Sequence, residues 1–487
     1  MFSVISVSAF TVLQAFCSTV IALIIGISCA FFTANRNFIG KHLLLSLSAI
    51  PLCLPSLLLA LGFVSFFGMS GTLNTLLKFL LGLDKSPVTF LYSFTGIVIA
   101  QGFYNFPLVM SSIHDAWGRI PPDESEAARL FGADELRIFR TVTIFQLFPA
   151  IISSCMLVFL YCFFSFLIIL LFGGIGCTTL EVEIYKSARA TLNFSETARL
   201  AISETLLACF FVFLHNLLEK KASSNRGISF YRHTGTAQIK APAERFFAFI
   251  IFLFILLFFA SPLASILYNA FSSAKNPLTI ETIIHVLKMR TFLPSLGNTI
   301  LVASATALFC VILAFFYASF VRTVDSEGRI TILKLIPMIP MAISAVILGV
   351  IITMLVKRGN VFHLIAAQSF IAFPLAFRQI YASLSKISQE TIDASRILSP
   401  KRRDLLFRIY LPSAWRGILS AAGFSFALSA GDTTLPLVLA LPNFSTLSLF
   451  TYRLAGAYRF HEACAAGVTL GMICAIVFAA ANRLKEK

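Results

Sequence analysis

About eleven apolar segments, each near the length that crosses a lipid bilayer, divide this sequence and restrict what it can fold into. A spanning helix needs about 20 mostly apolar residues, because the hydrocarbon layer is about 30 Å thick. Only 12% of the residues are charged, whereas soluble domains carry about 25%. We therefore predict an all-α polytopic membrane protein with spanning segments at residues 8–33, 43–68, 89–113, 147–173, 197–217, 246–270, 296–320, 333–356, 361–381, 412–440 and 460–482.

The net charge of +16 has two explanations. Basic proteins bind the phosphates of nucleic acid, but Lys and Arg also collect in the cytoplasmic loops of membrane proteins. The basic residues here gather in alternate loops, which favours the second explanation and predicts no nucleic-acid partner. We expect the N-terminus outside and the cytoplasmic loops at residues 34–42, 114–146, 218–245, 321–332 and 382–411.

Two stretches of the sequence repeat each other without a gap. Residues 100–145 align with residues 367–412 at a shift of 267, beginning with AQGFYNFPL in one and AQSFIAFPL in the other. The similarity continues through a polar loop, which chance similarity between two apolar helices would not produce. We predict two parallel tandem repeats of one membrane unit, at residues 1–217 and 246–487, joined by a basic cytoplasmic linker at 218–245.

The polar loop of each repeat contains one spaced pattern. Its positions are Glu126-Ala127-Ala128, three residues, Gly132, nine residues and Val142 to Phe145 in the first copy, and Asp393-Ala394-Ser395, three residues, Ser399, nine residues and Ile409, Tyr410, Leu411 and Pro412 in the second. Acidic residues suit the positive end of a helix dipole, and a residue such as Gly132 can end a helix. The pattern predicts a short amphipathic helix and a turn back to the membrane.

This pattern resembles the EAA loop of the permeases of binding-protein-dependent ABC importers, which reads E-A-A, three residues, G, nine residues and I-x-L-P. The first copy departs at Phe145, which replaces the proline, and the second departs at Ser399. The resemblance implies a multi-pass protein of the bacterial inner membrane, with an extracytoplasmic solute-binding protein as a partner. It also implies that each loop docks on one ATPase subunit, so that one chain binds two copies. An ordinary solvated loop is the alternative.

Several motifs of catalysis and metal binding are absent from the sequence. It contains no G-x-x-x-x-G-K-[ST] phosphate loop, no H-E-x-x-H, no G-x-S-x-G and no C-x-x-C pair. We therefore expect a transport subunit without enzymatic activity, cofactor or metal, with ATP hydrolysed on a separate subunit.

Polar residues within the apolar segments are candidates for a solute path, because polar groups are costly in lipid. The candidates are Gln101, Asn105, Glu204, Gln368 and Asp432. For the two glutamines, hydrogen bonding between helices is the alternative.

Two outer segments bear on the substrate. Gly173-Gly174 precedes CTTLEVEIY at 177–185, and FSTL at 444–447 precedes YRLAGAYR at 452–459. These segments are similar to the permeases of thiamine importers, which implies thiamine or its phosphates as substrate. Permeases for ferric iron share part of this pattern and remain the alternative. An aromatic path suits a thiazolium cation, whereas ferric iron prefers hard oxygen ligands.

The two repeats are unequal at their start. Residues 296–320 resemble residues 13–33, so the helix at 246–270 has no counterpart in the first repeat. We expect either that the first repeat has lost this leading helix or that the start codon lies upstream. An ion-gradient-driven secondary transporter and a membrane-anchored scaffold are the alternatives from other classes, and neither explains the repeated polar loop.

Overall fold

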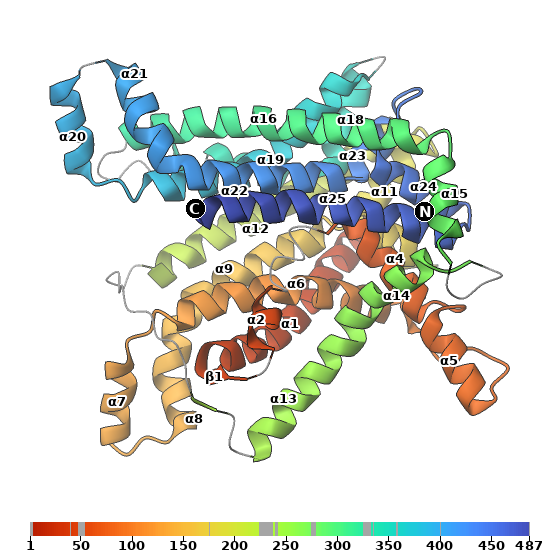
Figure 1. Ribbon diagram of the computed structural model, residues 1–487, viewed down its shortest axis with the longest axis horizontal. Helices are drawn as coiled ribbons and strands as arrows, with labels where there is room; N and C mark the ends of the chain where they lie inside the picture. Colours follow the sequence, from red (N-terminus) through yellow and green to blue (C-terminus); the bar gives the residue numbers. More distant parts are fainter. Residues whose placement is uncertain are drawn as a thin grey trace. The chain divides into compact units, whose positions relative to one another are not determined.

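The protein is helical almost throughout the part of the chain that the computed structural model describes (Figure 1). A pair of two-residue parallel strands, β1 (Arg36–Asn37) and β2 (Ala237–Gln238), is the exception. The all-α prediction is confirmed. The described residues are 3–38, 40–46, 54–174, 176–223, 237–238, 242–273, 279–324, 333–334, 336–356, 359–399 and 401–486.

Among these residues, nine helical stretches are long and apolar enough to cross a membrane. They are α1 (Val4–Asn35), α4 (Ser56–Phe67) with α5 (Thr72–Leu81), α6 (Phe94–Trp117), α8 (Glu135–Ile138) with η3 (Phe139–Thr143) and α9 (Ile144–Phe163), α12 (Phe194–Ser223), α13 (Pro242–Ile255) with η4 (Leu256–Ala260) and α14 (Ser261–Ala270), α16 (Phe292–Val324), α19 (Val361–Leu384) and α25 (Phe460–Glu486). A bent pair, η5 (Ile336–Ala342) and α18 (Ala345–Leu355), is a tenth candidate with an angle of 90°.

The remaining elements are shorter or less apolar. A further long helix, α22 (Leu411–Gly431), lies at the tenth predicted segment, 412–440, and contains Arg416 and several Ser and Gly residues. The others are α2 (Lys41–Ser46), η2 (Phe90–Tyr92), α7 (Pro122–Leu130), α10 (Leu167–Phe172), α11 (Leu180–Arg189), α15 (Glu281–Lys288), α20 (Gln389–Leu398), α21 (Arg402–Asp404), η6 (Leu405–Tyr410), α23 (Thr434–Leu439) and α24 (Leu447–Gly456).

The sequence repeat is also a structural repeat. A shift of 267 carries the bounds of α6 onto those of α19, and it places α9, α10 and α11 at the starts of α22, α23 and α24. Each copy has a proline inside the first of these helices, at Pro107 and Pro374. Each copy also has a π-helix, η3 or η6, directly before the long helix that follows the polar loop. The prediction of two tandem repeats is confirmed.

Three predicted segments differ in detail from the structure. The segments 147–173 and 412–440 are each a long helix followed by a short one, α9 with α10 and α22 with α23. In the second copy, Asp432 ends α22, and its carboxylate accepts the backbone N–H groups of Thr434 and Leu435 at the start of α23. The segment 43–68 falls partly on residues 47–53, outside the described residues, as do residues 224–236 and 239–241 of the predicted linker.

The chain forms two compact units that do not follow the limits predicted from the repeat. Unit 1 comprises residues 1–51, 62–184 and 193–265, and unit 2 comprises residues 52–61, 185–192 and 266–487. The helix that leads the second repeat therefore packs, as far as residue 265, in unit 1 against α1 and α6. The predicted domain limits describe the repeat in sequence and remain a prediction.

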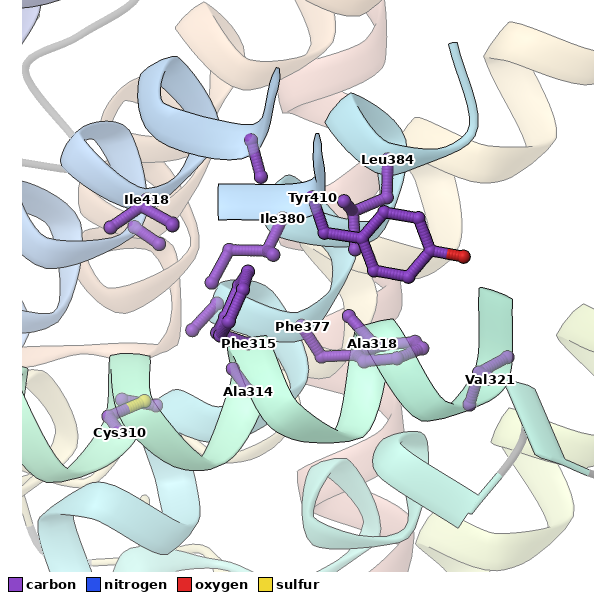
Figure 2. Close-up of a cluster of buried hydrophobic side chains, with 14 of the residues drawn as sticks. Cys310, Ala314, Phe315, Ala318, Val321, Phe377, Ile380, Leu384, Tyr410 and Ile418 are labelled. Carbon is purple, nitrogen blue, oxygen red and sulfur yellow. The ribbon is translucent and has the colours of Figure 1, made fainter. Parts of the chain in front are cut away.

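One buried cluster in unit 2 joins the membrane helices to the polar loop. It contains side chains of α16, α19 and α22, and it also takes in Ile392 of α20 and Tyr410 of η6. Figure 2 shows Tyr410 lying beside Ile380 and Leu384, above the α16 residues Phe315 and Ala318. The base of the loop is therefore part of the core.

Candidate functional site

The first polar loop is a nine-residue helix that ends on a glycine. Pro122 stands at its first position, where a proline costs no hydrogen bond, and Asp123 and Glu124 lie in its first turn. At the other end, Gly132 has φ +79°, and the N–H groups of Gly132 and Ala133 donate to the carbonyls of Arg129 and Ala128. These two backbone hydrogen bonds, together with a residue in the left-handed conformation, form the Schellman motif, which favours glycine.

A tight turn then leads back to the membrane. The carboxylate of Asp134 accepts the N–H of Arg137 at 2.9 Å and begins α8. The Arg129 guanidinium donates to Glu135 at 2.9 Å, and Gln146 donates to Glu124. These contacts hold the two arms of the first loop together at the surface, so it is an ordered element.

The second loop builds the same turn with different chemistry. Ser388 caps α20 by accepting the N–H of Thr391. Ser399, in place of the glycine, has φ −148° and needs no left-handed residue; its hydroxyl donates to Asp404 at 2.5 Å. Asp404 also pairs with Arg408 at 3.3 Å, and the Ser399 hydrogen bond lowers the pKa of the Asp404 carboxyl. A side-chain bond therefore closes the turn that Gly132 closes through its backbone.

The loops also differ in how firmly they are attached to the core. Ile392 of α20 is 1% exposed and lies in the cluster of Figure 2. Its counterpart in α7 is Ser125, and none of the described side chains of α7 is buried. The Arg322 guanidinium further donates to the carbonyl of Ile387, just before α20, at 2.8 Å.

The structure places the predicted loop residues at or near the surface. In the first copy Glu126, Ala127 and Gly132 are exposed and Ala128 is half-buried. In the second copy the exposed residues are Asp393, Ala394 and Pro412, and the half-buried ones are Ser395, Ser399, Ile409 and Leu411. Exposure of the small side chains leaves room for close approach of another surface.

The two apolar residues before each turn are not among the site residues predicted from the sequence. Leu130 and Phe131 are 89% and 92% exposed. Their counterparts at the shift of 267, Ile397 and Leu398, are 84% and 87% exposed. Each loop therefore carries two adjacent large apolar side chains that are almost wholly exposed at its tip. The sequence did contain a signal for these residues. In both loops an apolar pair occupies the last two of the three positions between E-A-A and the glycine position.

The buried glutamines of the two repeats hold helices together. Gln101 accepts a hydrogen bond from Ser18 of α1 at 2.9 Å. Gln368 accepts from Thr306 of α16 at 3.4 Å and from Ser429 at 2.5 Å. Gln368 also donates to Asp432 at 3.0 Å. The geometry places both glutamines between helices, as the hydrogen-bonding alternative expects.

The other two candidates for the path lie in unit 1. Asn105 is buried and donates to the carbonyl of Gln101 at 2.9 Å and to the Cys162 thiol. Glu204 is fully buried on α12, which packs against α9. The structure brings Asn105 and Gln101 together and leaves Glu204 apart from their hydrogen bonds. Among the described residues, no group of three His, Cys, Asp or Glu side chains is placed to hold a metal ion.

Two tyrosines of the outer segments, Tyr185 on α11 and Tyr452 on α24, are equivalent at the shift of 267 and lie in the same compact unit. Burial raises the pKa of the Tyr452 hydroxyl, and the charge of Tyr185 raises it further.

Comparison with known proteins agrees with this geometry. The sequence profile of the family described as "Binding-protein-dependent transport system inner membrane component" matches residues 22–224 and 330–485. The chain belongs to this family. It is accordingly a multi-pass protein of the bacterial inner membrane and a permease component of an ABC importer, a class that works with ATPase and solute-binding partners.

Relatives with curated names extend along the whole chain. The "Thiamine transport system permease protein ThiP" of Brucella abortus (strain 2308) is 26% identical over 496 residues, 98% of this chain and 87% of the relative. The protein of the same name from Escherichia coli (strain K12) is 24% identical, with 98% and 88% covered. A "Putative 2-aminoethylphosphonate transport system permease protein PhnU" of Salmonella typhi is 29% identical over 44% of this chain and 73% of its own.

One solved structure is similar over part of the chain. It is described as a bacterial ABC transporter involved in the import of the acidic polysaccharide alginate. The similarity covers 50% of this chain and 95% of that one, with 17% identity and a TM-score of 0.40.

Proposed function

We propose that this protein is the permease of an importer for thiamine or its phosphates, which a binding protein delivers from outside the inner membrane. Each of its two polar loops binds one ATPase subunit, so that a single chain works with two ATPase copies. The ATPase subunits hydrolyse ATP, and this chain has no enzymatic activity of its own.

The exposed apolar pairs are the observation that carries the docking role. Leu130 with Phe131, and Ile397 with Leu398, stand at equivalent tips of two ordered loops. Burying such a side chain in a partner gains about 1.5–3 kcal/mol, so each pair is a strong anchor. The polar residues around each pair, Glu126 and Asp393 among them, keep the loop soluble before docking.

Loop anchoring also supports transmission of force. Ile392 and Tyr410 belong to the same buried cluster as residues of α16, α19 and α22. Since packed interiors resist deformation, a push on α20 reaches these membrane helices. A secondary transporter driven by an ion gradient has no use for such an anchored, exposed helix.

The choice of thiamine rests on two observations. The thiamine permeases of two organisms are similar to this chain over 98% of its length. Tyr185 and Tyr452 place an aromatic ring at equivalent positions of the two outer segments, within one compact unit. The thiazolium ring of thiamine is a permanent cation, and aromatic faces attract cations.

Among the candidates for the path, unfilled hydrogen-bonding capacity favours Gln101 and Asn105. Gln101 Nε2 and Asn105 Oδ1 are buried and have no hydrogen-bond partner among the described residues. Buried polar groups without partners are costly, so a water or a polar group of the solute fits here. Gln368 and Asp432, in contrast, bond to each other and to neighbouring helices. Glu204 remains a candidate on its burial alone.

Reconstituted transport tests the proposal. The chain is purified with the ATPase and binding protein encoded beside it and placed in liposomes that contain ATP. We expect ATP-dependent uptake of labelled thiamine, its monophosphate or its diphosphate, and none of ferric iron. Uptake of iron alone contradicts the substrate, and uptake that follows an ion gradient without ATP contradicts the class. Uptake and ATPase co-purification should both be lost when Glu126-Ala127-Ala128 and Asp393-Ala394-Ser395 are deleted.

A further inference from the structure

The chain that follows the second polar loop carries a run of basic residues that the first loop lacks. At the shift of 267, Lys401-Arg402-Arg403-Asp404 stands where the first repeat has Asp134-Glu135-Leu136-Arg137, so the charge is reversed at three of the four positions. Residues 401–416, here called the basic arm, hold five basic residues and one acidic residue, for a net charge of +4. The aligned residues 134–149 hold two of each and are neutral.

The basic arm begins at the end of unit 2 where α20 and α21 lie beyond the long helices (Figure 1). Residues 401–403 are exposed, and the Arg408 side chain is 81% exposed. The acidic residue of the arm, Asp404, already accepts the Ser399 hydroxyl and pairs with Arg408. Because neighbouring like charges repel one another, the run at 401–403 is stabilised by an anionic partner.

Exposed aromatic side chains accompany these charges as the chain enters its next membrane helix. Phe407 of η6 is 50% exposed, and Trp415, in the second turn of α22, is 52% exposed. Arg416, next to Trp415, is also exposed. Tryptophan beside a basic residue is typical of the boundary between lipid and water. Basic residues with exposed aromatic rings are the composition of segments that lie on anionic membranes.

The placement of basic residues on the cytoplasmic side does not by itself account for the arm. That rule applies equally to both polar loops, and yet the aligned window of the first repeat is neutral. Docking of the ATPase does not account for the arm either. Under the proposed function the two loops bind two copies of one ATPase, so charges that recognise the ATPase would be alike in both loops.

We propose that the basic arm binds the headgroups of anionic phospholipids at the cytoplasmic surface of the membrane. The cytoplasmic location, and the argument that sets the ATPase aside, rest on the proposed function. Guanidinium groups bind phosphate through paired, charge-assisted hydrogen bonds. Tyr410 of the arm shares one buried cluster with Ile392 of α20, so lipid held on the arm steadies the base of the second docking loop.

Fluorescence quenching by brominated lipid tests the proposal, because Trp415 is one of only two tryptophans in the chain. The Trp117→Phe variant of the full chain is placed in phosphatidylcholine with a minor fraction of brominated phosphatidylglycerol, and in the opposite mixture. The two quenching values give the preference for anionic lipid at Trp415. We expect a preference of at least about fivefold, the factor for one basic residue at an anionic surface.

The first repeat provides the matched control position. Phe148 is the counterpart of Trp415 at the shift of 267 and is also 52% exposed. Phe148→Trp, with both native tryptophans replaced by Phe, reports on this position. We expect anionic and zwitterionic lipid to quench it equally. The same preference at both positions, or none at either, overturns the proposal.

A matched pair of charge substitutions separates lipid binding from ATPase docking. Arg402→Glu introduces the residue of the first repeat and should lower the preference at Trp415 by about fivefold or more. Lys386→Glu makes the same change of charge at an exposed position of the same loop, outside the arm, and should leave the preference unchanged. If Arg402→Glu weakens ATPase binding and leaves the lipid preference intact, the arm serves the ATPase and the proposal is wrong. The lipid measurements contain no ATPase, so they remain decisive even if the docking role fails.

Discussion

The two polar loops have the same length and the same place in their repeats, but they are built differently. The first ends its helix through the backbone, with Gly132 in a left-handed conformation, and α7 lies at the surface. The second depends on side chains, with Ser399 bonded to Asp404 and Ile392 buried in the core. What they share is the exposed apolar pair at the tip. The comparison suggests that the tip is the functional part and that its support can vary.

The largest effect is expected from removing the shared feature. Replacing Leu130 and Phe131 by Ser in one variant, and Ile397 and Leu398 by Ser in another, removes two anchors each time. At about 1.5–3 kcal/mol for each buried side chain, each variant should bind the ATPase at least about tenfold more weakly. Surface binding measurements with the purified ATPase check this.

The control for this prediction is an exposed apolar residue outside the loops. Phe79 on α5 is 86% exposed, and Phe79→Ser should leave ATPase binding unchanged. Equal loss of binding in this control, or full binding by both loop variants, would refute the role of the apolar pairs.

A smaller effect should separate the two loops. Ile392→Ala empties a buried site, which costs about 2–5 kcal/mol for such a truncation. The matched change Ser125→Ala in the first loop removes no buried side chain. Hydrogen exchange should therefore speed up at residues 389–398 in the first variant and stay unchanged at residues 122–130 in the second. If the two substitutions changed the hydrogen-exchange rates of their loops equally, the two loops would be attached to the core in the same way.

Substitutions of the two turn residues, Gly132 and Ser399, should change the stability of the loops by less than Ile392→Ala does. Gly132→Ala meets no neighbouring atom but must hold a left-handed backbone, which costs about 1–2 kcal/mol. Ser399→Gly should not stabilise the second loop, because φ there is −148° and the change removes the hydrogen bond to Asp404. Thermal unfolding measured by tryptophan fluorescence compares them, and stabilisation by Ser399→Gly would contradict the account.

The smallest effect concerns pH. The Ser399 hydrogen bond lowers the pKa of Asp404 in the folded protein. The stability that this hydrogen bond adds to the fold is therefore present above the ordinary aspartate pKa of about 3.9, and it is lost as pH falls through the lowered pKa. Ser399→Ala should raise this pKa and move the loss to higher pH. The first loop has Arg137 at the equivalent position and should show no such titration. Hydrogen exchange of residues 399–408 between pH 5 and 3 measures it, and an unchanged midpoint would oppose the assignment.

Much of the fold could be predicted because lipid imposes simple rules. Apolar runs of the right length became helices such as α1, α16 and α19, and the shift of 267 carried structure as well as sequence. The breaks at Phe164 and Asp432 were not predicted, because hydropathy does not report a change of direction within an apolar run. The π-helices η3, η4 and η6 were missed for a similar reason, since one extra residue in a turn leaves composition unchanged.

The candidate site was predictable as a pattern and less so as a surface. The spacing of the pattern located Gly132 and Ser399. It did not show that a hydrogen bond from Ser399 to Asp404 closes the second turn in place of a glycine, or that Ile392 is buried in the core. The presence of Tyr185 and Tyr452 in one compact unit depends on tertiary packing between repeats, which no local pattern contains. The helix-bonding role of Gln101 and Gln368 was foreseen as an alternative, because glutamine in a membrane helix needs a partner.

The central claim is that one chain offers two ATPase-docking tips, and native mass spectrometry of the purified importer tests it most directly. We predict one copy of this chain with two ATPase subunits. We also predict that the Leu130→Ser, Phe131→Ser variant retains only one of them. Two ATPase subunits on that variant, or a single ATPase subunit on the unaltered chain, would contradict the account.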